Sequence, residues 1–563
     1  MRRGTARLLG CALALCLISA CTDSPGGKPE ARRHGNSGST SGTVDRPKGL
    51  VFNSACALPL KLLRPIRRGY YPGRSPEVVA IPLHPSSFGN FQVTTHSGPW
   101  DYLQRVPLVL YGPRFIDAGG SLSIRRQVTL ADLAPTMAEL LRTPWPRSRP
   151  GRPLTEALLP EKKRLDPPQL IVVVVWDGGG WNVLNRWPNQ WPHLRKLMAS
   201  GVSIQDVRVG SSPSVTPAIH ATIGTGVYPK QHGIVDIFLR HGPKVVDSWD
   251  TQSPTYLEVL ALADLYDLRT DNKAKVGMVA EKGWHLGMIG HGAAIPGGDK
   301  DIAVMGSPGK QFTNEDYYSL PSYLSDVPGL EQDLQRVDLA DGRDDSAWLD
   351  HELVPLERTR LSPVFTLFQN RLLRTLIKRE QFGTDETTDL LYTNYKQLDL
   401  IGHVYNMIST EVADAIRYSD EALGDLENLL NRAVGKNDWV IAVTADHGQT
   451  PLPQSLQRAW PIEVNELERD ASDRFGIEAE DLFQKTRPGA MWLDKGRLMK
   501  SGYTLSDVAR YLLDYRVRDN MTADQVVPNG YEVRSSQRLF SSVFPYEWLP
   551  QVWSCAQDAR ERR

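Results

Sequence analysis

The sequence has no excess of charge of either sign. Its 65 Lys and Arg residues are balanced by 65 Asp and Glu residues among 563 positions. Proteins that mainly bind nucleic acid usually carry a broad basic surface, so we expect no nucleic-acid partner. A disordered chain is also excluded, because the 41% of residues that are hydrophobic must be buried. The composition is that of a folded globular protein.

Long apolar runs are also lacking, apart from a short one near the start. Three arginines among the first seven residues precede an apolar run at residues 8–20, which is shorter than the ~20 residues of a membrane-spanning helix. Such a start predicts an export signal over residues 1–20. The run ends in Leu17-Ile18-Ser19-Ala20-Cys21, which resembles the lipobox of bacterial lipoproteins. The resemblance implies that lipid on Cys21 anchors the exported protein to the outer face of a bacterial membrane. An ordinary secretory signal with a chance cysteine is the alternative.

Side chains that could form a core are scarce in the next segment. Residues 22–49 are mainly Ser, Gly, Thr, Pro and charged residues, and Val44 is the only sizeable aliphatic side chain among them. Because such a stretch cannot bury a core, we predict a flexible tether over residues 21–49.

Cysteine is scarce too, with five residues in the chain. Cys11 and Cys16 belong to the predicted signal and Cys21 to the predicted lipid anchor. This leaves Cys56 and Cys555, an even pair in a protein that we expect in an oxidising compartment.

What the sequence does contain is a series of short apolar runs that end near a carboxylate or a glycine. The runs are residues 170–176 before Asp177, 439–444 before Asp446, 390–394 before Asp399, and 106–111 before Gly112. Continuous runs rich in Val and Ile favour parallel strands buried on both faces. Residues 411–432 have helical periodicity. The alternation predicts an α/β fold with a mainly parallel central sheet flanked by helices, and an active site beyond the carboxyl ends of the strands.

The folded part is predicted as one catalytic domain over residues 50–555, with a tail at 556–563. Residues 240–387 are rich in Asp, Gly and Pro and have weaker strand signals. We expect this region to be a less regular insertion that contributes to the substrate pocket.

One segment identifies a family. Residues 211–234 read SSPSVTPAIHATIGTGVYPKQHGI. Pro217 favours the first position of a helix, so Thr216 is predicted as its N-cap, where free backbone N–H groups can hold a phosphate. The segment resembles the nucleophile motif of the alkaline phosphatase superfamily, especially the type I phosphodiesterase/nucleotide pyrophosphatase branch. Without that resemblance Thr216 would be interpreted as a helix cap alone.

Three further motifs resemble the same family. Asp177 ends a strand, Asp399 and His403 lie in Asp-x-x-Gly-His, and Asp446 and His447 begin Asp-His-Gly. The resemblance implies two zinc ions, with other divalent metals possible. One ion would be held by Asp177, Thr216, Asp446 and His447. The other would be held by Asp399, His403 and one more histidine.

The chemistry explains why such a site needs metals. A threonine hydroxyl is a poor nucleophile at neutral pH, and two metals about 4 Å apart can stabilise both the attacking and the leaving oxygen. Carboxylates and imidazoles are suitable zinc ligands. Taken singly, Asp399 could be a turn residue, His403 a surface residue and Asp446 a helix cap.

The remaining histidine ligand lies far downstream in most of the superfamily, but no histidine follows His447. Residues 95–102, 106–113, 133–136 and 151–154 resemble the closing segments of the family, here at the front of the chain. The resemblance assigns His96 to the second metal and implies a circular permutation. His84 lacks the pattern that follows His96 and is interpreted as a loop residue.

The permutation implies a cut just before Tyr70 and just after Phe544-Pro545. Cys56 and Cys555 flank this cut at similar distances, so we predict that they form a disulfide. Two unrelated buried thiols are the alternative.

Two departures from the family bear on the substrate. Ile237 follows Asp236 where the nucleotide pyrophosphatase branch has an Asn that contacts phosphate. Lys282 and His285 lie where monoesterase relatives can use a Lys-x-Arg pair, so Lys282 or His285 is a candidate phosphate ligand, with a loop Lys and a packed His as the alternative. The sulfatase branch is disfavoured because no Cys/Ser-x-Pro-x-Arg motif surrounds Thr216.

The resemblance implies metal-dependent hydrolysis of a small phosphate ester through a covalent phospho-threonine. Because the Lys-x-Arg pair that monoesterase relatives can use is incomplete here, we favour phosphodiesters or nucleotide pyrophosphates as substrates. The alternatives are a phosphomonoesterase, a phospho-group transferase and a lipoprotein that binds an anion without turnover. The intact Thr216 argues against the last of these.

Overall fold

The computed structural model describes residues 47–89, 95–164, 166–451, 459–522 and 531–561. The predicted signal at 1–20, the lipidated Cys21 and residues 21–46 of the tether lie outside the described residues. Among the residues that are described, no helix combines the length and the apolar character needed to cross a membrane.

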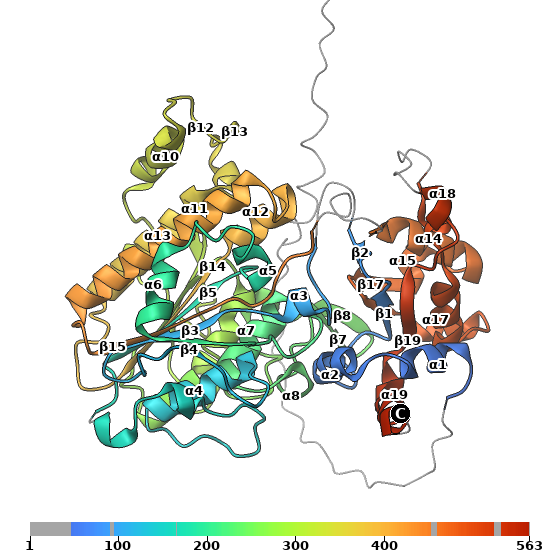
Figure 1. Ribbon diagram of the computed structural model, residues 1–563, viewed down its shortest axis with the longest axis horizontal. Coiled ribbons are helices and arrows are strands. Elements are labelled where there is room, and N and C mark those ends of the chain that lie inside the picture. Colours follow the sequence, from blue (N-terminus) through green and yellow to red (C-terminus); the bar gives the residue numbers. More distant parts are fainter. Residues whose placement is uncertain (1–46, 90–94, 165, 452–458, 523–530, 562–563) are drawn as a thin grey trace, which may run out of the picture. The chain divides into compact units, whose positions relative to one another are not determined.

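A nine-stranded sheet forms the larger of the two main sheets (Figure 1). Its strand order is β11-β10-β9-β14-β5-β15-β3-β6-β4. Strands β10, β9, β14, β5 and β15 are parallel, whereas β11 and β3 run antiparallel to their neighbours. The predicted α/β fold with a mainly parallel sheet is confirmed. The bounds are β3 Leu108–Tyr111, β4 Gly120–Leu122, β5 Leu170–Trp176, β6 Val202–Ile204, β9 Val276–Ala280, β10 Ile302–Ser307, β11 Lys310–Phe312, β14 Asp389–Tyr395 and β15 Trp439–Thr444.

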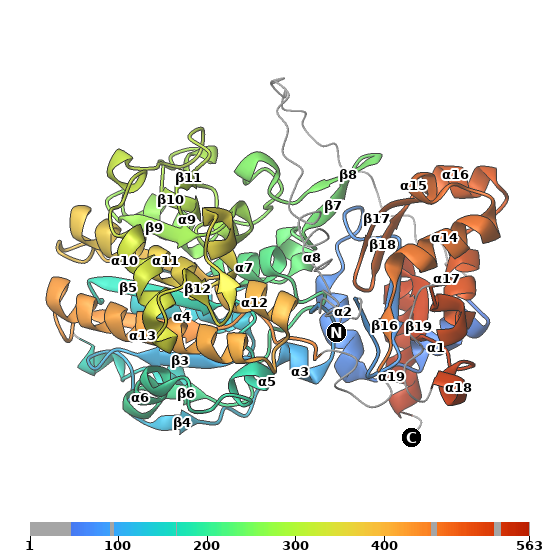
Figure 2. The same ribbon diagram turned by 90° about the horizontal axis from the view of Figure 1, so that it is seen from above.

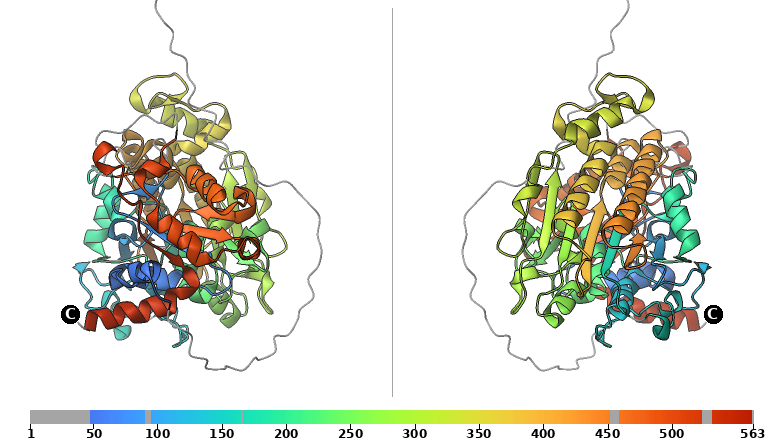
Figure 3. Two further views of the ribbon diagram at one scale, coloured as in Figure 1. Left: turned by 90° about the vertical axis from the view of Figure 1, so that its right-hand side faces the viewer. Right: turned by 90° about the vertical axis from the view of Figure 1, so that its left-hand side faces the viewer.

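Helices cover both faces of this sheet, which explains the unbroken apolar run of β5. Val172 and Val174 point to one face and Val173 and Val175 to the other, as the two-residue period of a strand requires. One face packs on α6 (Pro192–Ser200), α11 (Pro363–Arg379), α12 (Gln397–Tyr405) and α13 (Thr410–Ala433). The other packs on α4 (Leu133–Leu140), α7 (Thr216–Thr225) and α9 (Leu262–Arg269). Figure 3 (right) shows α11 and α13 side by side over the strands.

The region at 240–387 is more regular than expected. It supplies β9, β10 and β11 of the large sheet and the 17-residue helix α11. Its strands are short, and Gly277 interrupts the apolar pattern of β9, so the sequence signal is weak. The side chains of Phe382, Leu391 and Leu376 occupy the space beside Gly277, where a Cβ would meet them.

The second sheet joins the front of the described chain to its end. Its order is β17-β18-β1-β19, and every pair is antiparallel. Strand β1 (Val78–Pro82) lies between β18 (Ala490–Leu493) and β19 (Phe540–Pro545), and β17 (Phe483–Arg487) forms an edge. Figure 2 shows the hairpin of β7 (Phe238–His241) and β8 (Lys244–Asp247) reaching toward β17.

A disulfide ties the two ends of the described chain, as predicted. Cys56 in α1 (Leu50–Cys56) is bonded to Cys555 in α19 (Leu549–Glu561), with a Cα–Cα distance of 5.6 Å. Helix α19 continues beyond Cys555 to Glu561, so the predicted boundary at 555 lies inside a helix. The buried Leu549, Val552 and Ala556 attach this helix to the core of the small sheet.

Candidate active site

The predicted site residues follow neighbouring strands of the large sheet at its carboxyl edge. Asp177 comes directly after β5, Asp446 lies two residues beyond β15, and Lys282 lies two residues beyond β9. Because parallel strands end at the same edge, these side chains converge although they are far apart in sequence.

Glycines let the loops at this edge approach closely. Gly178 has φ +72°, and a Cβ there would lie 3.2 Å from the Asp399 Cα and 2.7 Å from the Gln449 side-chain nitrogen. A Cβ on Gly402 would collide with the same Gln449 amide. A side chain at Gly178 would therefore push the Asp177 loop away from helix α12, which carries Asp399, and a side chain at Gly402 would displace Gln449.

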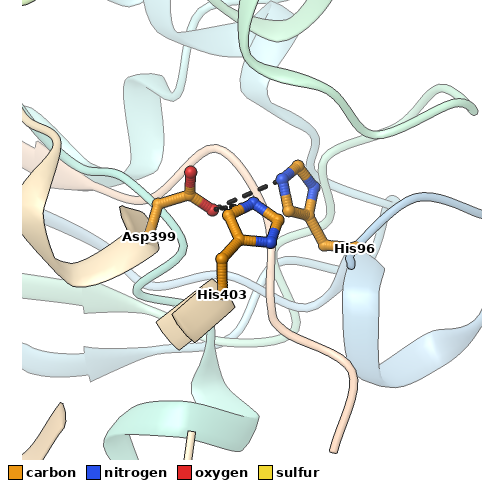
Figure 4. A group of neighbouring side chains, drawn as sticks. All are labelled: His96, Asp399 and His403. Carbon is orange, nitrogen blue, oxygen red and sulfur yellow. Dashed lines mark ion pairs between the residues drawn. The ribbon is translucent and has the colours of Figure 1, made fainter. Parts of the chain in front are cut away.

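His96, Asp399 and His403 form what we call the second ligand group (Figure 4). The Nε2 atoms of His96 and His403 lie 3.3 and 3.4 Å from Asp399 Oδ1. Asp399 and His403 are one helical turn apart on α12, and His96 arrives from the segment before β3. The Nδ1 atom of His96 lies 3.1 Å from the Ser214 carbonyl oxygen, an arrangement in which Nδ1–H donates and Nε2 is left as a potential ligand.

Asp177, Asp446 and His447, together with Thr216, form the first ligand group. His447 Nε2 lies 3.5 Å from Asp177 Oδ1 and 3.3 Å from Asp446 Oδ2. All three side chains are fully buried. His447 Nδ1 pairs with the Gly448 carbonyl oxygen at 3.0 Å, which again turns Nε2 toward the carboxylates.

Thr216 is the first residue of α7, and Val215 occupies the N-cap position. The prediction that Thr216 is the N-cap is therefore off by one residue, within the usual uncertainty of a helix boundary. Pro217 stands at the second position, where its missing N–H leaves no helical hydrogen bond unmade.

The spacings around Asp399 Oδ1 and around His447 Nε2 are those of ligands on a tetrahedral metal. Zinc bonds of 2.0–2.1 Å place neighbouring ligand atoms about 3.3 Å apart, and the distances above run from 3.3 to 3.5 Å. Asp177 and His447 also have ligand atoms within 4.8 Å of Asp399 and of each other. Asp446 Oδ2 and His447 Nε2 are buried and have no hydrogen-bond partner among the described residues. Burial lowers the pKa of His447 to about 4 and that of His96 well below its ordinary value, so both rings are neutral, as metal ligands must be.

Lys396 lies between the two ligand groups, and our sequence analysis did not identify it. Its Nζ donates to Asp177 Oδ1 at 2.9 Å and to Thr216 Oγ1 at 3.1 Å, and it pairs with Asp399 Oδ2 at 2.7 Å. Burial opposes the charge, but the surrounding carboxylates raise the pKa of Lys396. Its position three residues before Asp399, one helical turn away, was the available signal.

Lys396 and the neighbouring carboxylates change one another's pKa values. Burial would raise the pKa of Asp399, but Lys396 holds it well below its usual range. Burial and then Asp177 raise the pKa of Asp446 well above its usual range. One ammonium thus compensates the carboxylates of the site only in part.

Two further polar residues that we did not predict, Asn394 and His220, help to hold Asp177 in place. Asn394, at the end of β14, donates to Asp177 Oδ2 at 3.0 Å and lies 3.0 Å from His220 Nε2. His220 Nδ1 pairs with the Thr216 carbonyl oxygen at 2.8 Å. His220 was visible in the nucleophile motif, but nothing in its spacing indicated this contact.

The two candidate phosphate ligands lie at the same edge. His285 is fully buried, its ring meets that of His220 edge-on with centroids 4.7 Å apart, and neither of its nitrogens has a hydrogen-bond partner among the described residues. Lys282 Nζ lies over the Trp284 ring, 4.2 Å from its centroid. Burial, followed by the charges of Arg360 and Lys396, lowers the pKa of Lys282. His285 thus lies in the packed interior behind Thr216, and Lys282 is the more accessible of the two.

The chain resembles known proteins in sequence and fold. A model of the family "Type I phosphodiesterase / nucleotide pyrophosphatase" matches residues 171–541, more than half of the chain. Alkaline phosphatase PafA of Elizabethkingia meningoseptica is 24% identical over 438 residues, which cover 67% of this chain and 77% of that protein. Alkaline phosphatase PhoV of Synechococcus elongatus is 23% identical over 349 residues, which cover 52% of this chain and 61% of that protein. The crystal structure of PafA superposes with a TM-score of 0.53 at 19% identity, over 67% of this chain and 84% of that one.

Proposed function

Since this chain belongs to the type I phosphodiesterase/nucleotide pyrophosphatase family, we propose that it is a metal-dependent phosphohydrolase that uses Thr216 as its nucleophile. The observation that carries the proposal is the pair of ligand groups, in which the ligand atoms next to Asp399 Oδ1 and next to His447 Nε2 lie 3.3–3.5 Å away. Lys396 joins these groups to Thr216. The proposed metals are two zinc ions, since carboxylate and imidazole ligands at these spacings suit zinc.

In the proposed mechanism, Thr216 Oγ1 attacks phosphorus in line. The new bond joins Oγ1 to phosphorus, and the bond to the leaving oxygen breaks. The threonine proton passes to solvent, and the leaving oxygen takes up a proton from solvent. Water then breaks the phospho-threonine bond and restores the hydroxyl. Bound zinc would supply Lewis acidity for the hydroxyl and for the phosphoryl oxygens. Lys396 holds the Thr216 oxygen in place by donating to it, and α7 presents its N-terminal amides to the phosphoryl group.

We favour phosphodiesters or nucleotide pyrophosphates as substrates. Lys282 is a partly exposed cation beyond β9, and Trp284 stands where a Lys-x-Arg pair would place its Arg. The next residue, His285, is buried, and burial lowers its pKa well below the ordinary value. A diester has one negative charge on its phosphoryl oxygens and needs fewer cations than a monoester. Phosphomonoesters are the second candidate, because two relatives at 23–24% identity are named alkaline phosphatases.

We also propose that the chain is a circular permutation of the family pattern. The family match begins at residue 171, yet His96 completes the second ligand group. Strand β3 pairs with β15, β1 pairs with β19, and Tyr70 packs on Tyr546 with ring centroids 4.7 Å apart. These contacts support a cut near Tyr70 and Pro545. Export and a lipid anchor on Cys21 remain proposals that rest on the sequence of residues 1–21.

Turnover of two artificial substrates tests the proposed function. The full chain, stripped of metal by a chelator, should be inactive, and added zinc should restore hydrolysis of bis-p-nitrophenyl phosphate at alkaline pH. A higher kcat/KM for p-nitrophenyl phosphate would instead establish the monoesterase. Full activity without metal would overturn the metal-dependent mechanism.

A further inference from the structure

Lys396 contacts the two ligand groups in different ways. In the first group it bonds to Asp177 Oδ1, the same oxygen that lies 3.5 Å from His447 Nε2, and to the Thr216 hydroxyl. In the second group it pairs with Asp399 Oδ2 and leaves Oδ1 to the two histidines. An ion entering the first group must therefore take two ligand atoms from the ammonium group, whereas an ion entering the second group takes none.

The positive charge of Lys396 also disfavours a cation in the first group more than in the second. The ammonium group is within hydrogen-bond distance of both atoms that it would share with a cation in the first group. It is buried, with 3% of its side chain exposed, so solvent screens it little. The second group is separated from it by the width of one carboxylate and contributes two imidazoles, which bind metal in their uncharged form.

We propose that Lys396 makes the two metal sites unequal, so that the second ligand group binds zinc tightly and the first binds it weakly. This inference rests on the proposed metal dependence and adds a regulatory consequence to it. At low zinc the protein would hold one ion and keep Thr216 bound to Lys396, and activity would rise only as the weak site fills.

Zinc titration of the metal-free full chain by calorimetry at a fixed pH tests this proposal. The native chain should bind two ions in separate phases, with affinities that differ at least tenfold, the scale on which groups that contact metal ligands affect binding. Gel filtration in buffer without zinc should leave about one ion per chain, counted by mass spectrometry. Two ions bound with equal affinity, or no zinc bound at all, would overturn the proposal.

Lys396→Met removes the charge and keeps most of the side-chain volume. The weaker phase should tighten at least tenfold, and two ions should survive gel filtration. Lys196→Met is the matched control, because Lys196 pairs with Glu427 at the surface of α6 and its side chain is 61% exposed. It should titrate like the native chain.

Removing Lys396 leaves buried carboxylates uncompensated, so the metal-free variant could be unfolded. Lys396→Arg keeps the charge and should keep the unequal phases, and equal affinities in the native titration would overturn the proposal even if neither variant folds. Turnover is measured in parallel. Unequal binding without hydrolysis of any ester would overturn the proposed function and leave this inference standing. Two ions bound with equal affinity, together with hydrolysis of an ester, would overturn this inference and leave the proposed function standing.

Discussion

The two sheets differ in how the chain assembles them. The five parallel strands at the centre of the large sheet lie between residues 170 and 444, and most site residues follow one of them. The small sheet inserts β1, from the front of the described chain, between β18 and β19 near its end. Chemistry is therefore concentrated at the carboxyl edge of one sheet, while the other holds distant segments together. Substitutions in the two regions should affect different measurements.

The largest effect is expected at Thr216. Thr216→Ala should lower kcat by a factor on the order of 10³ or more, because no other hydroxyl replaces the nucleophile. The melting temperature and most zinc binding should remain, since Asp177, Asp446 and His447 are unchanged. Thr216→Ser keeps a hydroxyl at the start of α7 and should retain measurable turnover. Parental activity of the Ala variant would disprove the covalent mechanism.

The disulfide between Cys56 and Cys555 should matter for stability and little for turnover. Replacing both residues by Ser should lower the free energy of unfolding by about 2–5 kcal/mol, because a cross-link over 499 positions restricts the unfolded chain. Denaturant unfolding checks the size of the loss. Turnover at 25 °C should stay close to that of the parent, and a large loss of kcat there would contradict the separation between the two regions.

His96 connects the two regions, because it lies in the segment that leads from β1 to β3. His96→Ala should weaken zinc binding to the second ligand group at least tenfold. His84→Ala is the control: His84 lies on the same segment, and its ring packs against those of Trp100 and Tyr102. Calorimetry should detect no change in zinc affinity for that variant. Equal losses in both would mean that His96 supports the fold and does not bind metal.

The smallest effect concerns a buried carboxyl of the large-sheet region outside the site. Burial, followed by the neighbouring Asp299, raises the pKa of Asp267 in α9 to about 8, and no ion pair links it to a cation among the described residues. Because the folded protein binds this proton more tightly than the unfolded chain, ionisation favours unfolding as the pH rises from about 4 toward 8. Asp267→Asn should gain stability relative to the parent by on the order of 1 kcal/mol between pH 5 and pH 8. A pH-independent difference in denaturant unfolding would exclude this assignment.

Much of the large sheet was predictable because its signals are local. The apolar run at 170–176 coincides with β5, and the periodic stretch at 411–432 lies within α13. Strands β9 and β10 were not predicted, because both are short and Gly277 interrupts the apolar pattern of β9. The predicted ligands His96, Asp399 and His403 lie together, as do Asp177, Asp446 and His447, although their roles in binding metal stay predictions.

The kinds of side chain in the site, and the strands that carry most of them, follow from local patterns in the sequence. A ligand motif and an apolar run depend only on residues that are neighbours in the chain, so spacing and periodicity reveal both. The folded chain was needed to show that Lys396 lies between the ligand groups, that Asn394 and His220 support Asp177, and that β1 pairs with β19. These arrangements depend on which segments pack together after hundreds of intervening residues, and the pairing of strand edges and the burial of charge that select them arise only in the folded chain.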